Sequence, residues 1–276
     1  MLTAGQQERL AELFRLSLGA ARVIDLAHGR RLAEQAGVPL LAVERFALSL
    51  GVVPRRYERN IGTLGVEGQR RLLGCSAAVV GLGGLGGHVV ELLARLGVGR
   101  VAGLDGDTFD DGNLNRQLLA TAENLGDSKA AAAAARVARV NPAVAFEAHA
   151  VPFEQAPPDV LAGRDAVFDC LDTIPARREL ARRCAAAGVA LVHGAIAGWC
   201  GQVAVVPPGS GLLERLFSGS GAGGLEQRLG CLPFTAAAAA GIMVAAAVPV
   251  LLGRPAAGRS VCFFDLQSGE WETVEL

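Results

Sequence analysis

The sequence contains few aromatic and few charged residues. Aromatic residues make up 5% of the 276 residues and charged residues 19%, whereas 51% are hydrophobic and 36 are glycine. Disordered chains combine low hydrophobicity with high charge, so this composition excludes that class. With so few bulky side chains, we expect a fold that relies on close backbone contacts. The length predicts one large domain, or one domain with a small addition.

Neither sign of charge is in excess. The 26 basic and 27 acidic side chains leave a net charge of −1, so the chain lacks the positive excess that binding to nucleic-acid phosphates requires. Residues 33–43 do follow the spacing of a helix-turn-helix. The second helix of that motif would offer few groups for base edges, chiefly Glu44, Arg45 and Ser49. We therefore expect a helical hairpin packed on the main domain and no binding to nucleic acid.

The six cysteines lack paired spacing. No two of them form a C-x-x-C pair and the chain shows no secretory signal, so neither a disulfide framework nor a zinc tetrathiolate is predicted. We expect reduced thiols and a cytoplasmic protein. Residues 236–252 carry no charge, but they are mostly alanine and include Gly241 and Pro249. A helix buried against a sheet explains this run better than a membrane span does.

Hydrophobic periodicity divides the chain into two parts. Residues 1–55 carry hydrophobic side chains at helical spacing, which predicts a helical N-terminal segment. Residues 56–276 alternate between strands and helices, which is typical of an α/β domain. We expect a Rossmann-like mixed sheet with parallel strands in its N-terminal half and antiparallel strands near its C-terminus. Residues 207–230, rich in Gly, Ser and Pro, are expected to form a mobile loop over the site.

The individual elements of the α/β domain can also be placed. Strands are expected at residues 77–81, 100–105, 144–149, 166–170, 189–192, 196–206 and 261–271. Helices are expected at residues 84–96, 129–140, 175–187 and 236–252. The last two strands of this series should be antiparallel and flank the alanine-rich helix.

A G-x-G-x-x-G motif joins the first of these strands to its helix. Gly81 permits a tight turn, Gly83 lets the backbone approach a phosphate, and Gly86 allows close packing of helix on strand. The free N–H groups where the helix begins, at Gly84, favour an anion. Asp105 ends the next strand, where a carboxylate accepts hydrogen bonds from a ribose. The motif predicts an adenine nucleotide, and by itself it also fits a dinucleotide-dependent oxidoreductase.

The residues after Asp105 favour ATP over a dinucleotide. Arg116 follows Asn113 in an Asn-Leu-Asn-Arg-Gln run, and Lys129 begins a helix. Hydride transfer does not need an arginine and a lysine that converge on phosphates. Attack on the α-phosphate of ATP does, because negative charge builds up on the phosphoryl oxygens and must be neutralised.

Several further motifs extend this pattern along the chain. They are Arg56-Tyr57-Glu58-Arg59-Asn60, Glu67-Gly68-Gln69, Asp105-Gly106-Asp107, Asn113-Leu114-Asn115-Arg116-Gln117, Lys129, Asn141-Pro142 and Asp169-Cys170-Leu171-Asp172. Together with the glycine motif they resemble the MoeB/ThiF/HesA family, bacterial relatives of ubiquitin-activating enzymes, over residues 56–276. That family uses Mg-ATP to adenylate the C-terminal glycine carboxylate of a small ubiquitin-like protein, usually a sulfur carrier, and releases pyrophosphate.

The resemblance implies a role for each matching residue. The nucleotide-binding set is Gly81, Gly83, Gly84, Gly86, Asp105, Asp107, Asn113 and Gln117, with Asp105 on the ribose. Asn113, Arg116 and Lys129 would hold the phosphates, with Gln117 nearby, and Asp172 would bind Mg²⁺. Arg59 would reach the phosphates bound by the partner subunit, which makes a homodimer part of the active site. No protein nucleophile is needed, because the substrate carboxylate attacks and catalysis rests on positioning and charge stabilisation.

The chain departs from the family pattern at a few positions. It lacks the two C-x-x-C pairs of many members, so no zinc is expected. Cys231 lies where some members use a cysteine to accept the activated carrier, and it is a possible thiol nucleophile; Cys200 is a weaker candidate. Thr173 replaces the usual asparagine after Asp172. A dinucleotide-dependent oxidoreductase, a tRNA-modification dehydratase of the same family and a non-catalytic nucleotide-binding protein stay open as alternatives.

Overall fold

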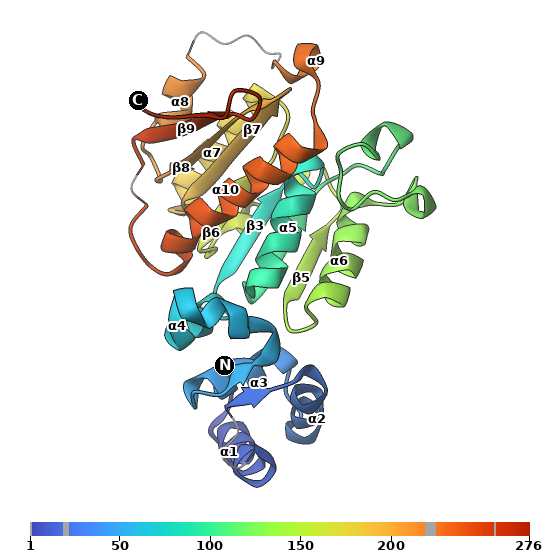
Figure 1. Ribbon diagram of the computed structural model, residues 1–276, viewed down its shortest axis with the longest axis vertical. Helices are drawn as coiled ribbons and strands as arrows, with labels where there is room; N and C mark the ends of the chain where they lie inside the picture. Colours follow the sequence, from blue (N-terminus) through green and yellow to red (C-terminus); the bar gives the residue numbers. More distant parts are fainter. Residues whose placement is uncertain (1, 19–21, 219–224, 257) are drawn as a thin grey trace.

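The computed structural model describes residues 2–18, 22–218, 225–256 and 258–276. Figure 1 shows a small helical unit at the N-terminus beside a larger sheet that carries helices on both faces. The small unit contains α1 (Ala4–Leu18), α2 (Leu26–Ala36) and α3 (Leu40–Ser49), with the short parallel strands β1 (Val23–Ile24) and β2 (Val53–Pro54). The helices expected in residues 1–55 are therefore present.

The helical unit has its own core and is fixed to the main domain by buried polar contacts. Its core includes Leu10, Phe14 and Leu32. Glu44 of α3 is 2% exposed and forms an ion pair with Arg56. One of the few groups that could have contacted a DNA base is thus buried inside the protein. The unit packs as a helical hairpin on the domain, as the sequence predicted.

The main sheet has eight strands in the order β10-β9-β8-β7-β6-β3-β4-β5. Its strands are β3 (Ser76–Val80), β4 (Arg100–Leu104), β5 (Ala145–His149), β6 (Ala166–Asp169), β7 (Leu191–Ala197), β8 (Cys200–Val206), β9 (Ser260–Asp265) and β10 (Glu270–Glu275). The strands from β5 to β7 are parallel, and those from β7 to β10 pair antiparallel. The prediction of a mixed sheet with a parallel half and antiparallel C-terminal strands is confirmed.

Two of the predicted strands were placed wrongly, because each crosses a hairpin turn. The strand expected at residues 196–206 is the end of β7, a turn and β8, with Gly198 at φ +55°. The strand expected at residues 261–271 is β9, a turn containing Gly269 at φ +75°, and the start of β10. Glycines in the left-handed region make these turns, and the apolar residues on both sides of each turn led to the assignment of one long strand.

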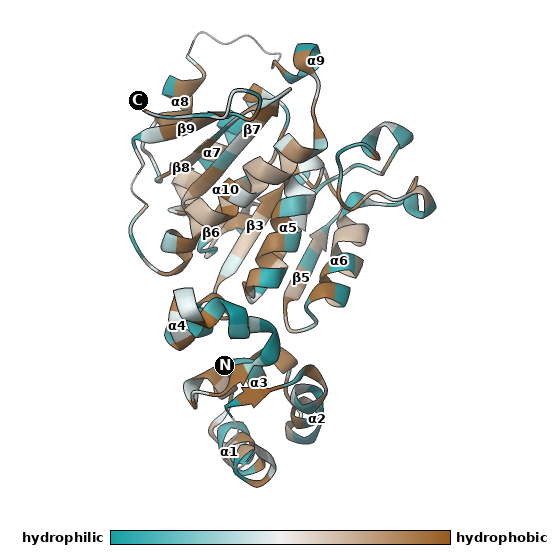
Figure 2. Cartoon of the chain, in the orientation of Figure 1, coloured by the Kyte–Doolittle hydropathy of each residue, from teal (hydrophilic) through white to brown (hydrophobic). Residues whose placement is uncertain are grey.

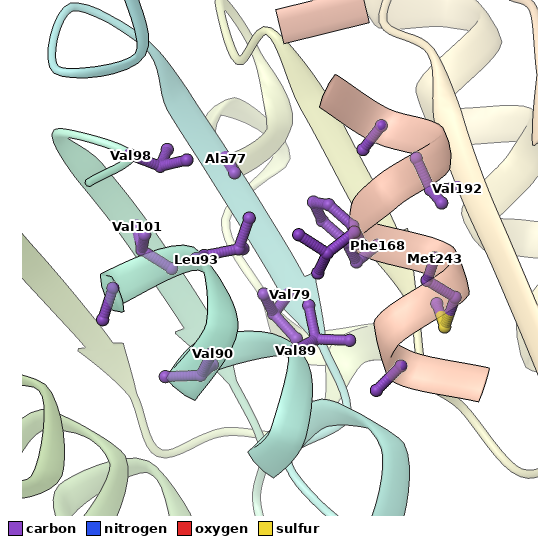
Figure 3. Close-up of a cluster of buried hydrophobic side chains, with 14 of the residues drawn as sticks. Ala77, Val79, Val89, Val90, Leu93, Val98, Val101, Phe168, Val192 and Met243 are labelled. Atoms are coloured by element: carbon purple, nitrogen blue, oxygen red, sulfur yellow. The ribbon is translucent and has the colours of Figure 1, made fainter. Parts of the chain in front are cut away.

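Helices cover both faces of this sheet. On one face lie α5 (Gly84–Leu96), α6 (Lys129–Val140) and α10 (Pro233–Leu251), and on the other lie α7 (Ile174–Ala187) and α8 (Leu212–Leu216). The connecting elements are α4 (Glu58–Leu72), α9 (Glu226–Leu229) and short 3₁₀ turns at Arg55–Tyr57, Asp111–Asn113, Ala122–Asn124, Phe153–Gln155 and Pro158–Leu161. Figure 3 shows the core of the first face, where Val89, Val90 and Leu93 lie beside Val79, Phe168 and Met243.

The alanine-rich helix α10 packs on the sheet. It is long and apolar enough to span a membrane by length and composition, and Figure 2 shows apolar colouring along it. Its buried residues include Ala236, Ala240 and Met243, which contact the strands and α5. A Cβ on Gly194 of β7 would lie 2.2 Å from the Met243 sulfur. Small residues thus let helix and sheet approach closely, which explains part of the glycine and alanine content.

Residues 207–230 contain more secondary structure than expected. The short helices α8 and α9 form within them, while residues 219–224 lie outside the described residues. Leu212 and Leu213 are fully buried, and Arg178 of α7 donates a hydrogen bond to the Phe217 carbonyl at 2.8 Å. The expectation of a loop without helices is therefore wrong at α8, because its leucines pack against α7. Mobility of the remaining segment stays a prediction.

Candidate active site

The glycine motif forms a turn that no other residue type could make. Gly81 has φ +89°, and a Cβ there would lie 2.6 Å from the Cys170 carbonyl oxygen. A Cβ on Gly86 would lie 1.8 Å from the Gly81 carbonyl oxygen. The loop between β3 and α5 is thus compressed against β6 on one side and its own helix on the other. This geometry leaves backbone N–H groups at the start of α5 facing outward, where an anion can bind.

Two side chains from the 111–117 region lie over this loop. A Cβ on Gly83 would lie 3.4 Å from Gln117 Nε2, and one on Gly84 would lie 3.6 Å from Arg116 Cγ. Gln117 is buried, yet its Oε1 has no hydrogen-bond partner in the described structure. A buried acceptor without a partner costs about 1–3 kcal/mol. A hydroxyl or amino group of a bound nucleotide would satisfy it.

Asp105 fixes the glycine loop from the end of β4. Its Oδ2 accepts a hydrogen bond from the Leu82 N–H at 2.7 Å, and its Oδ1 accepts one from the Asp107 N–H at 2.8 Å. Each carboxylate oxygen keeps a second lone pair for a ligand hydroxyl. The structure therefore places Asp105 beside the loop, where the predicted contact with a ribose can be made.

Two cations lie close to the same loop region. Lys129 begins α6, is 6% exposed, and forms an ion pair with Asp107 at 3.0 Å. Arg116 donates hydrogen bonds to the Gly112 carbonyl at 2.9 Å and to Asn115 Oδ1 at 2.8 Å. Within the described residues Arg116 forms no ion pair. Its positive charge is thus held in place without being neutralised.

Asn113 has a structural role in the same segment. It is buried, and its Oδ1 accepts a hydrogen bond from the Asp110 N–H at 3.2 Å within a reciprocal cap. The cap closes the turn that carries Arg116 and Gln117. Its amide NH₂ forms no hydrogen bond to the part of the chain that the structure describes, so the predicted phosphate contact is still open to it.

The structure does not bring Arg59 to the glycine loop of its own chain. Arg59 lies near the start of α4 and is exposed. Figure 1 shows α4 near the N-terminal end of β3, whereas the glycine loop follows the C-terminal end of that strand. This separation excludes Arg59 from the site formed within one chain.

Asp172 lies at the rim of a cavity of about 340 Å³ beyond the end of β6. Its side chain is exposed, and it forms no hydrogen bond or ion pair with any residue that the structure describes. The described residues contain no cluster of three His, Cys, Asp or Glu side chains that could hold a metal ion. A free single carboxylate fits Mg²⁺ only where substrate phosphates and water supply the other ligands.

A buried polar cluster at the floor of this cavity was not found from the sequence. His193 of β7 donates from Nδ1 to Asp169 Oδ2 at 2.7 Å, and Arg177 Nη1 lies 3.4 Å from the same oxygen. Gln202 Nε2 lies 3.1 Å from His193 Nε2. Burial would raise the pKa of Asp169, but Arg177 and His193 outweigh it and hold that pKa below its usual value. Burial lowers the pKa of His193, so the imidazole is neutral.

The candidate thiol does not show the features of a nucleophile. Cys231 is half-buried, and its carbonyl accepts a hydrogen bond from Asn115 Nδ2 at 3.2 Å. Burial raises the pKa of the Cys231 thiol, although Arg116 opposes this. The exposed Cys200 has its pKa raised by desolvation and by Asp265. A reactive thiol needs a lowered pKa, so the structure gives neither cysteine an activated thiolate.

Comparisons with known proteins fit this site. The model of the ThiF family matches residues 57–276. Over 230 residues the chain is 35% identical to the SAMP-activating enzyme E1 of Haloferax volcanii, covering 79% of this chain and 84% of that protein. It is 40% identical over 153 residues to a sulfur carrier protein adenylyltransferase of Thermus thermophilus, covering 54% and 56%.

The fold is also shared with a solved structure. The crystal structure of E. coli MccB with ATP superimposes with a TM-score of 0.69 over 98% of this chain and 86% of that one. At 15% sequence identity this likeness concerns the fold alone. The family model, in contrast, covers the whole α/β domain with its glycine loop, its two cations and Asp172. The chain therefore belongs to the ThiF family.

Proposed function

We propose that this protein adenylates the C-terminal carboxylate of a ubiquitin-like sulfur carrier protein that ends in Gly-Gly, using ATP and releasing pyrophosphate. The observation that carries the proposal is that Arg116 lies over a loop whose glycines leave no room for a side chain, while Lys129 is held by Asp107, next to the carboxylate that fixes this loop. The functions of the Haloferax and Thermus relatives, activation of a SAMP and adenylation of a sulfur carrier, support the same reaction.

Each part of the site has a function in this reaction. The N–H groups at the start of α5 bind phosphate oxygens, and Asp105 accepts hydrogen bonds from the ribose. The carrier carboxylate attacks the α-phosphorus, forming an acyl C–O–P linkage while the bond from the α-phosphorus to the bridging oxygen breaks. Pyrophosphate leaves with the bonding electron pair. Arg116 and Lys129 stabilise the negative charge that grows on the phosphoryl oxygens.

Asp172 is the residue that would hold Mg²⁺ in this site. When bound there, Mg²⁺ would supply positive charge beside the phosphate oxygens. The exposed carboxylate of Asp172 at the cavity rim, which forms no hydrogen bond or ion pair with any described residue, supports this assignment. The absence of any C-x-x-C pair in the sequence supports a protein that works without structural zinc.

A homodimer completes the proposed site. In one chain, α4 lies at the opposite end of β3 from the glycine loop (Figure 1). The arginine that contacts the phosphates is therefore Arg59 of the partner subunit. The uncharged outer surface of α10, with Ala237 and Ala245 exposed, supports contact with a second copy. The free cysteines and the packing of α10 on the sheet support a cytoplasmic location.

Pyrophosphate–ATP exchange tests the proposal. Wild-type protein should incorporate labelled pyrophosphate into ATP only when a carrier with a terminal Gly-Gly is present. Arg116→Ala should lower the exchange rate by about a hundredfold, because a donor that stabilises transition-state charge is lost. Arg95→Ala, which removes an exposed arginine of α5 paired with Glu91, is the matched control and should leave exchange unchanged.

Other outcomes would favour the alternatives. Binding of NADH without binding of ATP would contradict the proposal and favour a dinucleotide-dependent oxidoreductase. Exchange that requires tRNA in place of the carrier would favour the dehydratase. If Arg116→Ala and Arg95→Ala exchanged equally fast, the phosphate-binding role of Arg116 would be wrong.

A further inference from the structure

The cavity beyond β6 and β7 extends well past Asp172 and has a distinctive lining. Its walls are made by small or apolar side chains, and its floor is polar. Its polar side chains are those of Asp172, Arg177, Gln202 and Glu226, and its apolar side chains include Phe217 and Phe263. A cleft of about 340 Å³ with largely apolar walls and a few polar side chains has the make-up of a ligand-binding site, and its volume suits a short peptide segment with small side chains.

Arg177 presents a free hydrogen-bonding edge to this cavity. The residue is only 7% exposed. Its side-chain contacts all use Nη1, which donates to the Gly194 carbonyl at 2.7 Å and lies close to Asp169 and His193. Its Nε and Nη2 form no hydrogen bond with any described residue. A planar guanidinium with two donor nitrogens left over on a buried arginine is a strong binding group for a carbonyl oxygen.

Gln202 complements Arg177 with an acceptor. The neutral His193 donates from Nδ1 to Asp169, so its Nε2 is the acceptor for the Gln202 amide NH₂ at 3.1 Å. This hydrogen bond fixes the orientation of the amide and leaves its Oε1 without a partner among the described residues. The floor therefore offers both a donor edge and an acceptor, which is the pattern of an amide N–H and C=O in an extended peptide.

The charges around the cavity decide between a carbonyl and a carboxylate as the ligand of Arg177. Asp169 already balances the arginine, and the lining adds the carboxylates of Asp172 and Glu226. A further negative charge at Arg177 would have no cation to pair with in a largely buried position, which is costly. A neutral peptide carbonyl has no such cost. The terminal carboxylate is instead attracted to Arg116 and Lys129 beside the glycine loop.

From these contacts we propose that Arg177 and Gln202 bind the backbone of the carrier's C-terminal segment and set its register. Arg177 donates to a peptide carbonyl and Gln202 accepts from a peptide N–H. The chain then continues past Asp172, and its terminal carboxylate reaches the α-phosphate. His193 is a positioning residue, because it holds Gln202 directly and Arg177 through Asp169. This inference rests on the proposed function, since it specifies how the acceptor is held.

Steady-state exchange kinetics test the inference with Arg177→Lys and Gln202→Leu. The probe is the ubiquitin-like carrier ending in Gly-Gly that supports exchange by the wild type. Arg177→Lys keeps the positive charge beside Asp169 and removes the planar guanidinium with its free Nε and Nη2 donors. Both variants should raise the KM for the carrier by about ten- to a hundredfold, as for loss of a charge-assisted or buried hydrogen bond, while the KM for ATP stays the same. Arg182→Lys, on an exposed arginine of the same helix, should change neither.

Two further measurements keep the result interpretable. Thermal unfolding identifies a variant that fails to fold. If Arg177→Lys fails to fold, the carrier KM of Gln202→Leu decides whether the inference holds. Direct binding of a synthetic peptide with the last residues of the carrier to wild-type protein should weaken when one of its amides is replaced by an ester. A carrier KM equal to that of the wild type in folded Gln202→Leu would overturn the inference. If wild-type protein shows no carrier-dependent exchange at all, the proposed function itself fails.

Discussion

Replacing Gly86 by alanine should disrupt ATP binding through the glycine loop. The added Cβ would lie 1.8 Å from the Gly81 carbonyl oxygen, whereas ordinary contacts begin at 3.4 Å, so the helix and the loop must separate by about 3.4 − 1.8 = 1.6 Å. Overpacking of this kind costs about 1–3 kcal/mol of unfolding free energy. The same shift moves the N–H groups away from the phosphates, and a misplacement of about 1 Å can cost a hundredfold.

ATP-induced stabilisation provides a sensitive assay of this prediction. At an ATP concentration of about 100 times the wild-type Kd, binding stabilises the folded protein by about 2.7 kcal/mol. If Gly86→Ala weakens binding by about a hundredfold, the same concentration yields only about 0.4 kcal/mol. Chemical unfolding with and without ATP would measure the difference directly for both proteins.

Gly241→Ala is the matched control for this substitution. Gly241 lies within helix α10, and a Cβ there would meet no atom within 4 Å. An alanine in the interior of a helix should stabilise the protein by about 0.5–1 kcal/mol relative to glycine and leave ATP binding unchanged. The reasoning is refuted if Gly86→Ala retains the ATP-induced stabilisation of the wild type.

Two other substitutions follow from the pKa values of buried groups. Because burial raises the pKa of the Cys231 thiol and the reaction needs no protein nucleophile, Cys231→Ser should exchange pyrophosphate at the wild-type rate; a large loss would show that Cys231 contributes to adenylation itself. Burial lowers the pKa of His193, so below about pH 6.5 the unfolded chain binds a proton that the folded protein refuses. The contribution of His193 to the free energy of unfolding is therefore present above that pH and is lost as the pH falls. The lowered pKa of Asp169 has an effect of the same sign at lower pH. The fall in Tm between about pH 7.5 and pH 5.5 should be smaller in His193→Gln than in the wild type; equal slopes would contradict the assignment.

Much of the nucleotide-binding region was predictable, because it is local in sequence. The turn at Gly81, the start of α5 at Gly84 and the position of Asp105 follow from a strand, a turn and a helix in succession. Each of these features depends on backbone conformation and on neighbours within a few residues. Arg116 and Gln117 were found because they lie in one short motif, although only the structure shows them over the loop.

The errors concern the antiparallel part of the sheet. Apolar residues on both sides of the turns at Gly198 and Gly269 were assigned to single long strands, although the second turn, Asp265-Leu266-Gln267-Ser268-Gly269-Glu270, is largely polar. Likewise, the polar and glycine-rich composition of residues 207–230 concealed α8, whose stability comes from burying Leu212 and Leu213. Tertiary packing thus decided α8 against its local composition.

The sequence by itself determined the family, the type of nucleotide and the alternation of strands and helices, since motifs and periodicity express local geometry. Only the tertiary structure decided which distant residues meet. Asp169 and His193 are direct partners across β6 and β7, and the hairpin of β7 and β8 returns Gln202 to the same imidazole. The tertiary structure also separated Arg59 from the loop of its own chain. Strand register and the placing of α4 set these relations, and neither is encoded by the spacing of residues along the chain.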